Sequence, residues 1–286
     1  MVGLKANTGI RRAALVACLL LLGACSSTTF VYNRLDTILP WYLDDYVELN
    51  SSQDKQLDRL LQPFLAWHRQ QELPRYMAIL DQLDADLDQT LTPDQIGLIY
   101  TEVEVAWLQL QDQSLAWLLA LGATLSDEQV EEFLAYLQER QEEYEEEYLS
   151  RSEREYREES YEAFEDSMQD YLGRLSSSQR QRLRGASLDL QRSDQVWLQE
   201  RAAWLQRLAV LMQREPGWEE RVREAIALRD ETVSPAYTAT YEHNLGVVFS
   251  AIADVLNSRS DKQDRYLRAE LENLREDLQT LVAQAS

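Results

Sequence analysis

The stretch Leu91-Thr92-Pro93-Asp94-Gln95 has the composition of a helix start. An apolar residue precedes Thr92, whose side chain suits a helix N-cap, and Gln95 follows three positions later, where its amide can bond back to the cap. Pro93 takes the first helical position, where its missing N–H costs no hydrogen bond. The stretch therefore predicts a helix that begins at Pro93.

The same pattern of an apolar residue, a capping residue and a glutamine three positions later occurs three more times. It is found at Leu49-Asn50-Ser51-Ser52-Gln53, Leu125-Ser126-Asp127-Glu128-Gln129 and Leu175-Ser176-Ser177-Ser178-Gln179. The four starts are 42, 34 and 50 residues apart, which is too irregular for a solenoid of fixed period. We therefore predict an elongated bundle of antiparallel helices.

Strong helix formers dominate the chain, and only nine glycines and six prolines interrupt it, which predicts an all-α fold. Residues 32–286 should form a single all-helical domain. The expected helices are 51–87, 93–121, 127–173, 177–214, 217–256 and 260–284, after a short helical segment over 33–48 interrupted at Pro40. Pro63 and Pro74 should kink or split the first long helix, and Ser234-Pro235 should break the fifth.

The first 24 residues have the features of an export signal. Lys5, Arg11 and Arg12 precede an uncharged segment over residues 13–24, which is the order of a charged and then an apolar region. This segment of 12 residues is too short for a permanent transmembrane helix, which takes about 20. We therefore expect residues 1–24 to be removed.

The segment ends in Leu22-Gly23-Ala24-Cys25, which resembles the lipobox of bacterial lipoproteins. The resemblance implies cleavage between Ala24 and Cys25 and acylation of Cys25 with fatty chains such as palmitate. Stable anchoring takes more than one acyl chain, so a multiply acylated Cys25 would hold the protein on a bilayer. The alternative is an ordinary secretory signal or an N-terminal anchor that contains an unmodified cysteine.

Two neighbouring features refine this expectation. A weaker match at Cys18 leaves too short an apolar segment after Arg12. Ser26 follows Cys25, and in lipoproteins of bacteria with two membranes a serine at this position implies transport to the outer membrane. We therefore expect residues 25–31 to be a lipidated start and short tether at the periplasmic face of the outer membrane, in the cell envelope.

The mature chain is strongly acidic. The full sequence has 28 Lys and Arg residues against 50 Asp and Glu residues, and removal of residues 1–24 takes away three basic residues and no acidic one, so the formal charge changes from −22 to about −25. Nucleic acids and anionic lipid surfaces both require clustered basic residues. The charge argues against nucleic-acid binding and against lying flat on anionic lipid, so we expect the body to stand off the membrane, tethered by its first residue.

The segment 127–173 is the longest expected helix, and between Asp127 and Asp166 it carries 17 acidic residues and only four arginines. Its aromatic residues recur at helical spacing, with Tyr144, Tyr148 and Tyr156 in the middle of the stripe. One interpretation is a solvated helix that lies against the bundle, or projects from it, through its tyrosine edge. The other is a docking arm for a basic partner, in which these tyrosines are anchors and the glutamates steer the encounter.

The sequence contains no pattern typical of catalysis or metal binding. The two histidines, His68 and His243, have no His or Cys three or four positions away, so neither completes a helical metal clamp. Glu242 and His243 would hold a metal only weakly, and the alternative is a histidine that packs or forms a hydrogen bond at a helix edge.

With Cys18 removed and Cys25 acylated, no thiol remains for a disulfide, a nucleophile or a metal site. We expect no cofactor and no enzymatic activity, although a deep pocket that contained a histidine would favour an enzyme.

The stretch Tyr32-Asn33-Arg34-Leu35-Asp36, followed by residues 39–46, resembles the start of an uncharacterised family of bacterial lipoproteins. That resemblance implies an all-helical body over most of the mature chain and supplies no activity. The stretch is rich in aromatic and acidic residues, and it either lines a groove or buttresses the body near the membrane. A looser resemblance links the Leu-Thr-x-x-Gln pattern to small helical periplasmic stress chaperones, although this chain is more than twice as long as those proteins, and well-capped helices use the same residues.

These observations favour one function and leave a second open. The first is a membrane-anchored, non-catalytic envelope lipoprotein that acts as a helical scaffold or interaction module for other envelope proteins. The alternative is a periplasm-facing chaperone or secretion helper.

Overall fold

The computed structural model describes residues 27–284, and every regular element in that range is a helix. The all-α prediction is confirmed. The first elements are α2 (Ser27–Tyr32), α3 (Leu35–Asp44), α4 (Ser51–Trp67), the π-helix η1 (His68–Glu72), α5 (Leu73–Asp86), α6 (Pro93–Gly122) and α7 (Asp127–Leu149). They are followed by α8 (Glu153–Leu172), α9 (Ser177–Asp189), α10 (Asp194–Leu211), α11 (Trp218–Ala227), the 3₁₀-helix η2 (Arg229–Glu231), α12 (Pro235–Asn257) and α13 (Asp261–Ala283). Ala24 and Cys25 lie outside the described residues.

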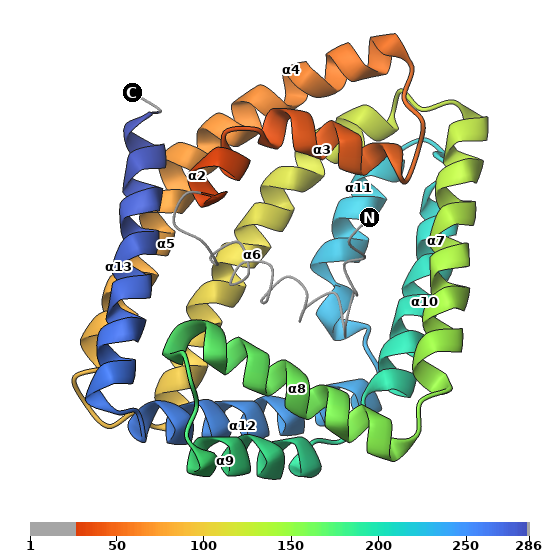
Figure 1. The fold of residues 1–286 in the computed structure, drawn as a ribbon. Helices are drawn as coiled ribbons and strands as arrows, with labels where there is room; N and C mark the ends of the chain where they lie inside the picture. The colour runs from red at the N-terminus through yellow and green to blue at the C-terminus, as the bar shows by residue number, and fades with distance from the viewer. Residues whose placement is uncertain (1–26, 285–286) are drawn as a thin grey trace.

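The helices form the sides of a four-sided frame (Figure 1). One side contains α3 and α4, the next α7 and α10, the third α8, α9 and α12, and the fourth α5 and α13. Helix α6 crosses the frame and packs against α4 near one end and α12 near the other. The antiparallel pairing expected from the sequence is present, but the pairs run along different sides instead of sharing the long axis of one bundle.

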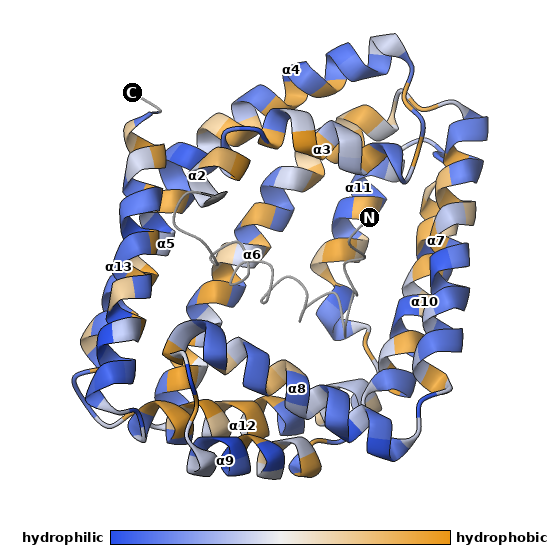
Figure 2. Cartoon of the chain, in the orientation of Figure 1, coloured by the Kyte–Doolittle hydropathy of each residue, from blue (hydrophilic) through white to orange (hydrophobic). Residues whose placement is uncertain are grey.

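The helices carry both apolar and polar residues along their length (Figure 2), and the buried apolar residues form four groups where helices meet. The largest group of buried apolar residues joins α8, α9, α12 and α13 to the loop between α5 and α6. Smaller groups join α6 to α7, α10 and α11, then α4 to α6, and α5 to α13. The core is therefore divided among the sides and corners of the frame.

All four predicted capping boxes are confirmed. In each of them the N-cap side chain accepts a hydrogen bond from the backbone N–H of the glutamine, and the glutamine side chain accepts one from the N-cap backbone N–H. Two more boxes of the same design are formed by Ser152 with Glu155 and by Ser260 with Gln263. Local capping chemistry thus sets six of the helix starts.

The prediction of one long acidic helix over 127–173 is wrong. Helix α7 ends at Leu149 and α8 begins at Glu153, because Ser152 caps a new helix and the preceding Arg151 turns inward. The Arg151 guanidinium pairs with the carboxylate of Asp194 at 2.7 Å, and both side chains are buried. The chain therefore turns a corner of the frame at this point.

The predicted helix over 177–214 is also interrupted. Helix α9 ends at Asp189 and α10 begins at Asp194. The intervening backbone is held by Asn244 of α12, whose side-chain amide accepts a hydrogen bond from the N–H of Gln191 and donates one to its carbonyl, each at 2.8 Å. The expected break near Ser234-Pro235 is confirmed, because α12 begins at Pro235.

The prolines in the first third of the chain have different effects. Pro74 follows the π-helix η1, in which the N–H of Leu73 reaches the carbonyl of His68. The wider turn accommodates the missing N–H of Pro74, so this proline splits the predicted helix over 51–87 as expected. Pro63 and Pro40 instead lie within α4 and α3, and neither ends its helix.

Candidate functional site

Helix α2, the first described element, is fixed to the last helix of the chain. The Thr29 hydroxyl donates a hydrogen bond to the Asp277 carboxylate at 3.2 Å, and the Asn33 side-chain amide donates one to Gln284 at 3.0 Å. Residues 27–31 were expected to belong to a short tether, but from Ser27 onward the chain is helical. In this helix the Thr29–Asp277 hydrogen bond connects these residues to α13.

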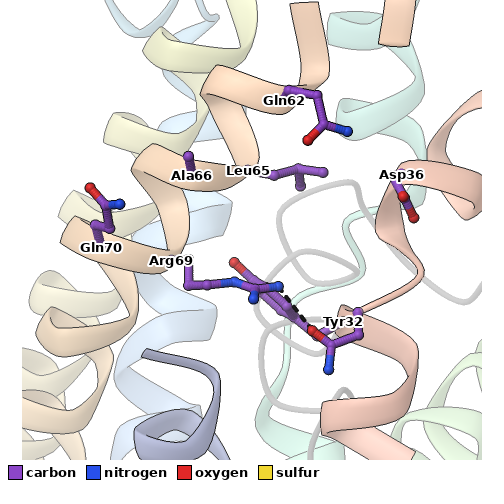
Figure 3. A pocket seen from close by; sticks show the side chains of 8 residues that line it. Tyr32, Asp36, Gln62, Leu65, Ala66, Arg69 and Gln70 are labelled. Atoms are coloured by element: carbon purple, nitrogen blue, oxygen red, sulfur yellow. Dashed lines mark hydrogen bonds between the residues drawn. The ribbon is translucent and has the colours of Figure 1, made fainter. Parts of the chain in front are cut away.

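An open hollow of about 250 Å³ lies where α2 and α3 meet α4 and η1 (Figure 3). The side chains that line it are mostly polar: Tyr32, Asn33, Asp36, Gln62, Leu65, Ala66, Arg69 and Gln70. The three residues that define the Tyr-Asn-x-x-Asp stretch are among them. These three residues therefore line a groove, which is one of the two alternatives for that stretch, and Asn33 also contacts Gln284.

Arg69 is the basic group of this hollow. Its Nη2 donates a hydrogen bond to Oδ1 of Asn33 at 2.9 Å (Figure 3). Its guanidinium carbon lies 5.1 Å from the centre of the Tyr32 ring, a distance at which a cation is attracted to the face of an aromatic ring. Arg69 thus joins η1 to α2 across the hollow.

His68 lies behind this contact and joins two tyrosines. The Tyr32 hydroxyl is 2.8 Å from Nδ1 and the Tyr76 hydroxyl is 3.3 Å from Nε2. Burial, together with the nearby Arg69 charge, lowers the pKa of His68 to about 4. The neutral ring has one donor and one acceptor nitrogen, which matches the two hydroxyl groups. This geometry fits a structural connector, since a general base works best with a pKa near the working pH.

His243 is exposed, and its Nε2 lies 2.9 Å from the backbone carbonyl of Asp189. This contact is the helix-edge hydrogen bond that the sequence left open as an alternative to metal binding. Within residues 27–284 no three His, Cys, Asp or Glu side chains are grouped so that they could hold a metal ion.

Tyr148 and Tyr156 lie inside the protein, each with only 1% of its surface exposed. The Tyr148 ring stacks on Tyr144 at 5.7 Å and lies 5.8 Å from the Trp197 ring of α10. The guanidinium of Arg151 lies 4.5 Å from the centre of the Tyr148 ring. The predicted partner anchors Tyr148 and Tyr156 are thus part of a structural joint between α7, α8 and α10, and only Tyr144 remains partly exposed.

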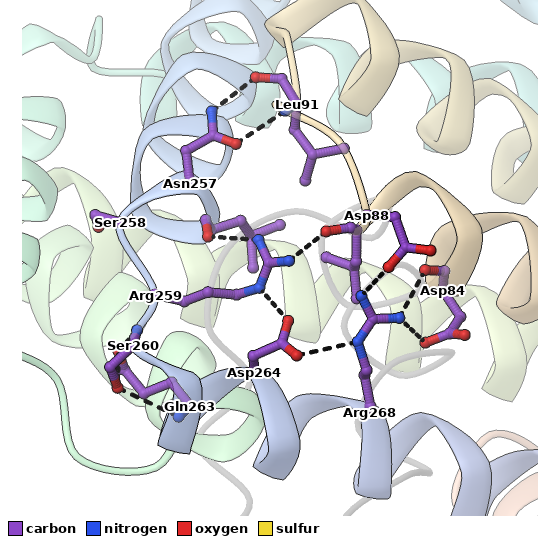
Figure 4. A network of polar contacts seen from close by, with 12 residues as sticks. Asp84, Asp88, Leu91, Asn257, Ser258, Arg259, Ser260, Gln263, Asp264 and Arg268 are labelled. Carbon is purple, nitrogen blue, oxygen red and sulfur yellow. Dashed lines mark hydrogen bonds and ion pairs between the residues drawn. The ribbon is translucent and has the colours of Figure 1, made fainter.

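Arginines elsewhere in the frame are also used for internal contacts (Figure 4). Arg268 of α13 pairs with Asp84 at 2.8 Å and with Asp88 at 2.7 Å. The Arg268 side chain is 29% exposed, whereas the Asp84 and Asp88 side chains are 49% and 74% exposed. The basic group therefore lies beneath its acidic partners, and this corner presents a largely anionic surface.

The fold and these contacts define an all-α protein with an acidic surface. Among residues 27–284, none of the helices combines the length and the apolar composition that crossing a membrane requires. Residues 45–238 match the profile of the family described as "Family of unknown function (DUF6279)". The chain belongs to this family.

Membership in a family of unknown function agrees with the expectation from the sequence. Most of the stretch that suggested it, including Tyr32, Asn33 and Asp36, precedes the matched residues. No curated protein and no solved structure matches the chain.

Proposed function

We propose that the protein is a lipid-anchored, non-catalytic component of the bacterial cell envelope, a rigid helical scaffold that engages other envelope proteins at the periplasmic face of the outer membrane. The observation that carries the proposal is the Leu22-Gly23-Ala24-Cys25 stretch at the end of an export signal. An acylated Cys25 would be followed, two residues later, by a helix that is fixed to the body.

Rigidity of the frame supports a scaffold role. The capping glutamines Gln53 and Gln129 bond to each other and join the starts of α4 and α7. Gln179 and Gln263 do the same for α9 and α13. Buried polar networks in which both partners are satisfied fix one arrangement of the elements they join, so the sides of the frame keep constant positions.

Charge indicates the kind of partner. A formal charge of about −25 on the mature chain, with arginines such as Arg268 beneath their acidic partners, favours a basic protein surface. Complementary charge raises the rate of association and disfavours acidic competitors. The partner should therefore be a basic envelope protein, and its binding should weaken as ionic strength rises.

The experiment is affinity capture from detergent-solubilised envelopes at native expression level. The wild type should retain a defined basic partner at low salt and lose it at high salt. The Cys25→Ser variant, exported but unacylated, should retain less of it, because the partner and the bait no longer share a membrane. A wild-type bait that retains no protein at low salt would contradict the scaffold role.

A chaperone or secretion helper is the second candidate, and exposed apolar side chains favour it. Leu98, Leu188 and Val210 are 68%, 62% and 64% exposed and lie on three different helices. Suppression of the aggregation of an unfolding client, lost when these three residues become serine, would favour this function over the scaffold. No suppression at stoichiometric excess would exclude it.

A further inference from the structure

The two helices that come first in the described chain expose large aromatic side chains. Phe30 of α2 is 56% exposed. In α3, Trp41 is 69% exposed and Tyr42 is 51% exposed. No residue of α3 is fully buried. Tryptophan is usually largely buried in folded proteins, so an outward-facing tryptophan on such a helix calls for a surface that covers it.

The position of these helices indicates which surface that is. Only Ser26 separates Cys25 from α2, and two extended residues span at most about 7 Å. Helix α2 is itself fixed to the body through Thr29 and Asp277. Acyl chains on Cys25 would therefore bring α2 to the headgroups of the bilayer, with no long linker to hold the body away.

The side chains on α2 and α3 suit the bilayer interface. Tryptophan and tyrosine concentrate at headgroup level, where the ring contacts apolar chains while the polar atom contacts water. The Arg34 guanidinium lies 4.2 Å from the Phe30 ring centre, so this cation lies next to an aromatic group that would enter the interface.

Charge selects the kind of lipid. The exposed side chains of α3 and of the residue that follows it include Asp36, Asp44 and Asp45, and Arg34 is the only exposed basic residue in the described part of α2, α3 and the turn between them. Anionic headgroups would repel this segment, whereas zwitterionic headgroups offer ammonium groups to the carboxylates. A zwitterionic phospholipid surface is therefore the matching partner.

We propose that α2 and α3 form a second, non-covalent contact with the membrane, in which Phe30 and Trp41 enter the interface of a zwitterionic phospholipid bilayer and fix the orientation of the frame. This inference rests on the proposed lipid anchor at Cys25. It replaces a body that stands off the membrane with one that is held against it along α2 and α3.

A first test uses the unacylated mature chain, with Cys25→Ser, and vesicles of phosphatidylcholine. The protein should bind these vesicles weakly, and Phe30→Ser with Trp41→Ser should lower the partition coefficient by about tenfold or more, because each aromatic ring buries apolar area. Leu188→Ser with Val210→Ser is the matched control, since these side chains are equally exposed on other helices, and it should leave binding unchanged. Equal losses in both variants would contradict a specific site on α2 and α3.

The closing experiment uses the acylated wild type and its Trp41→Phe variant in phosphatidylcholine vesicles that carry bromine on the acyl chains. Bromine quenches a tryptophan only at short range, so the fluorescence difference between the two proteins isolates Trp41. We expect the Trp41 signal to be quenched by at least about half and to be protected from acrylamide in the water phase. A Trp41 signal that acrylamide reaches freely and bromine does not quench would overturn the inference.

The outcomes separate this inference from the proposed function. An acylated Cys25 with an unquenched Trp41 would leave the anchor in place and remove the membrane contact. An unmodified Cys25 with vesicle binding that depends on Trp41 would remove the anchor and retain the contact.

Discussion

The side-chain amides of Gln53 and Gln129 bond to each other twice. Nε2 of Gln53 lies 2.8 Å from Oε1 of Gln129, and Nε2 of Gln129 lies 2.9 Å from Oε1 of Gln53. Each Oε1 also accepts the backbone N–H of its own N-cap, Asn50 or Ser126, at 2.9 Å. Residues that cap two helices therefore also join them, so one residue type serves both local and long-range structure.

Gln53→Leu should lower the free energy of unfolding by about 3 kcal/mol, because it removes the cap bond to Asn50, both amide bonds to Gln129 and the hydrogen bond to the Thr124 carbonyl. The control is Gln95→Leu, which changes a capping glutamine at the same helix position. It should cost about 1 kcal/mol, since it removes mainly the local cap. Urea unfolding followed by circular dichroism measures both values, and equal losses would contradict the role of the amide pair.

Asp194→Ala should destabilise the joint between α7, α8 and α10 by about 3 kcal/mol, because it leaves the buried Arg151 guanidinium without its buried partner. The Asp194 and Arg151 side chains are 3% and 9% exposed. Glu158→Ala breaks an ion pair with Arg184 in which both side chains are half exposed, and it should change stability little. Thermal unfolding of the two variants compares them, and similar midpoints would show that the buried pair is unimportant.

His68 should make the protein less stable in mild acid. Its pKa is about 4 in the folded protein and 6.5 in the unfolded chain, so the unfolded state binds more protons between these values. The contribution is complete above about pH 6.5 and is lost as the pH falls toward 4, by up to about 3 kcal/mol. His68→Phe should be less stable at pH 7 because it loses the Tyr32 contact, but its stability should fall less between pH 7 and 4. Denaturant titrations at several pH values across this range measure the free energy of unfolding of both proteins. A parallel pH dependence of the two would contradict the assignment of the lowered pKa to His68.

Glu72→Gln should stabilise the protein at pH 7 by about 1 kcal/mol. The Glu72 side chain is buried, with Oε2 lacking a hydrogen-bond partner, and burial raises its pKa. Because folding raises the pKa of this carboxyl group, the folded state becomes less stable relative to the unfolded state as the pH rises and the group ionises. The stability advantage of Glu72→Gln over the wild type should therefore shrink as the pH falls. A difference in the free energy of unfolding that stays constant between pH 4 and 7 would indicate another cause.

Local chemistry explains which helix boundaries could be predicted from the sequence. The capping residue Ser176 and its glutamine partner lie three positions apart, so the start of α9 follows from neighbouring residues alone. The break between α7 and α8 carries a similar signal, Ser152 with Glu155, which the surrounding acidic residues obscured. The break after Asp189 has no such signal, because Asn244, 53 positions after Gln191, holds the backbone there.

The candidate site likewise combines residues that the sequence indicates with partners that it does not. Tyr32, Asn33 and Asp36 stand out in the sequence, and all three line one hollow. Their partners Arg69 and His68 are 36 positions later, and no local pattern indicates this contact. Periodicity likewise placed Tyr148 on a helical stripe, but it contained no information about which helix covers that stripe.

The central claim is that Cys25 carries the membrane anchor. The most direct measurement is the mass of the N-terminal peptide of the mature protein purified from bacterial membranes. We predict a chain that begins at Cys25 and bears acyl groups, together with loss of the protein from the membrane fraction in the Cys25→Ser variant. An N-terminal peptide with a free Cys25 thiol, or a chain cut elsewhere, would contradict the account.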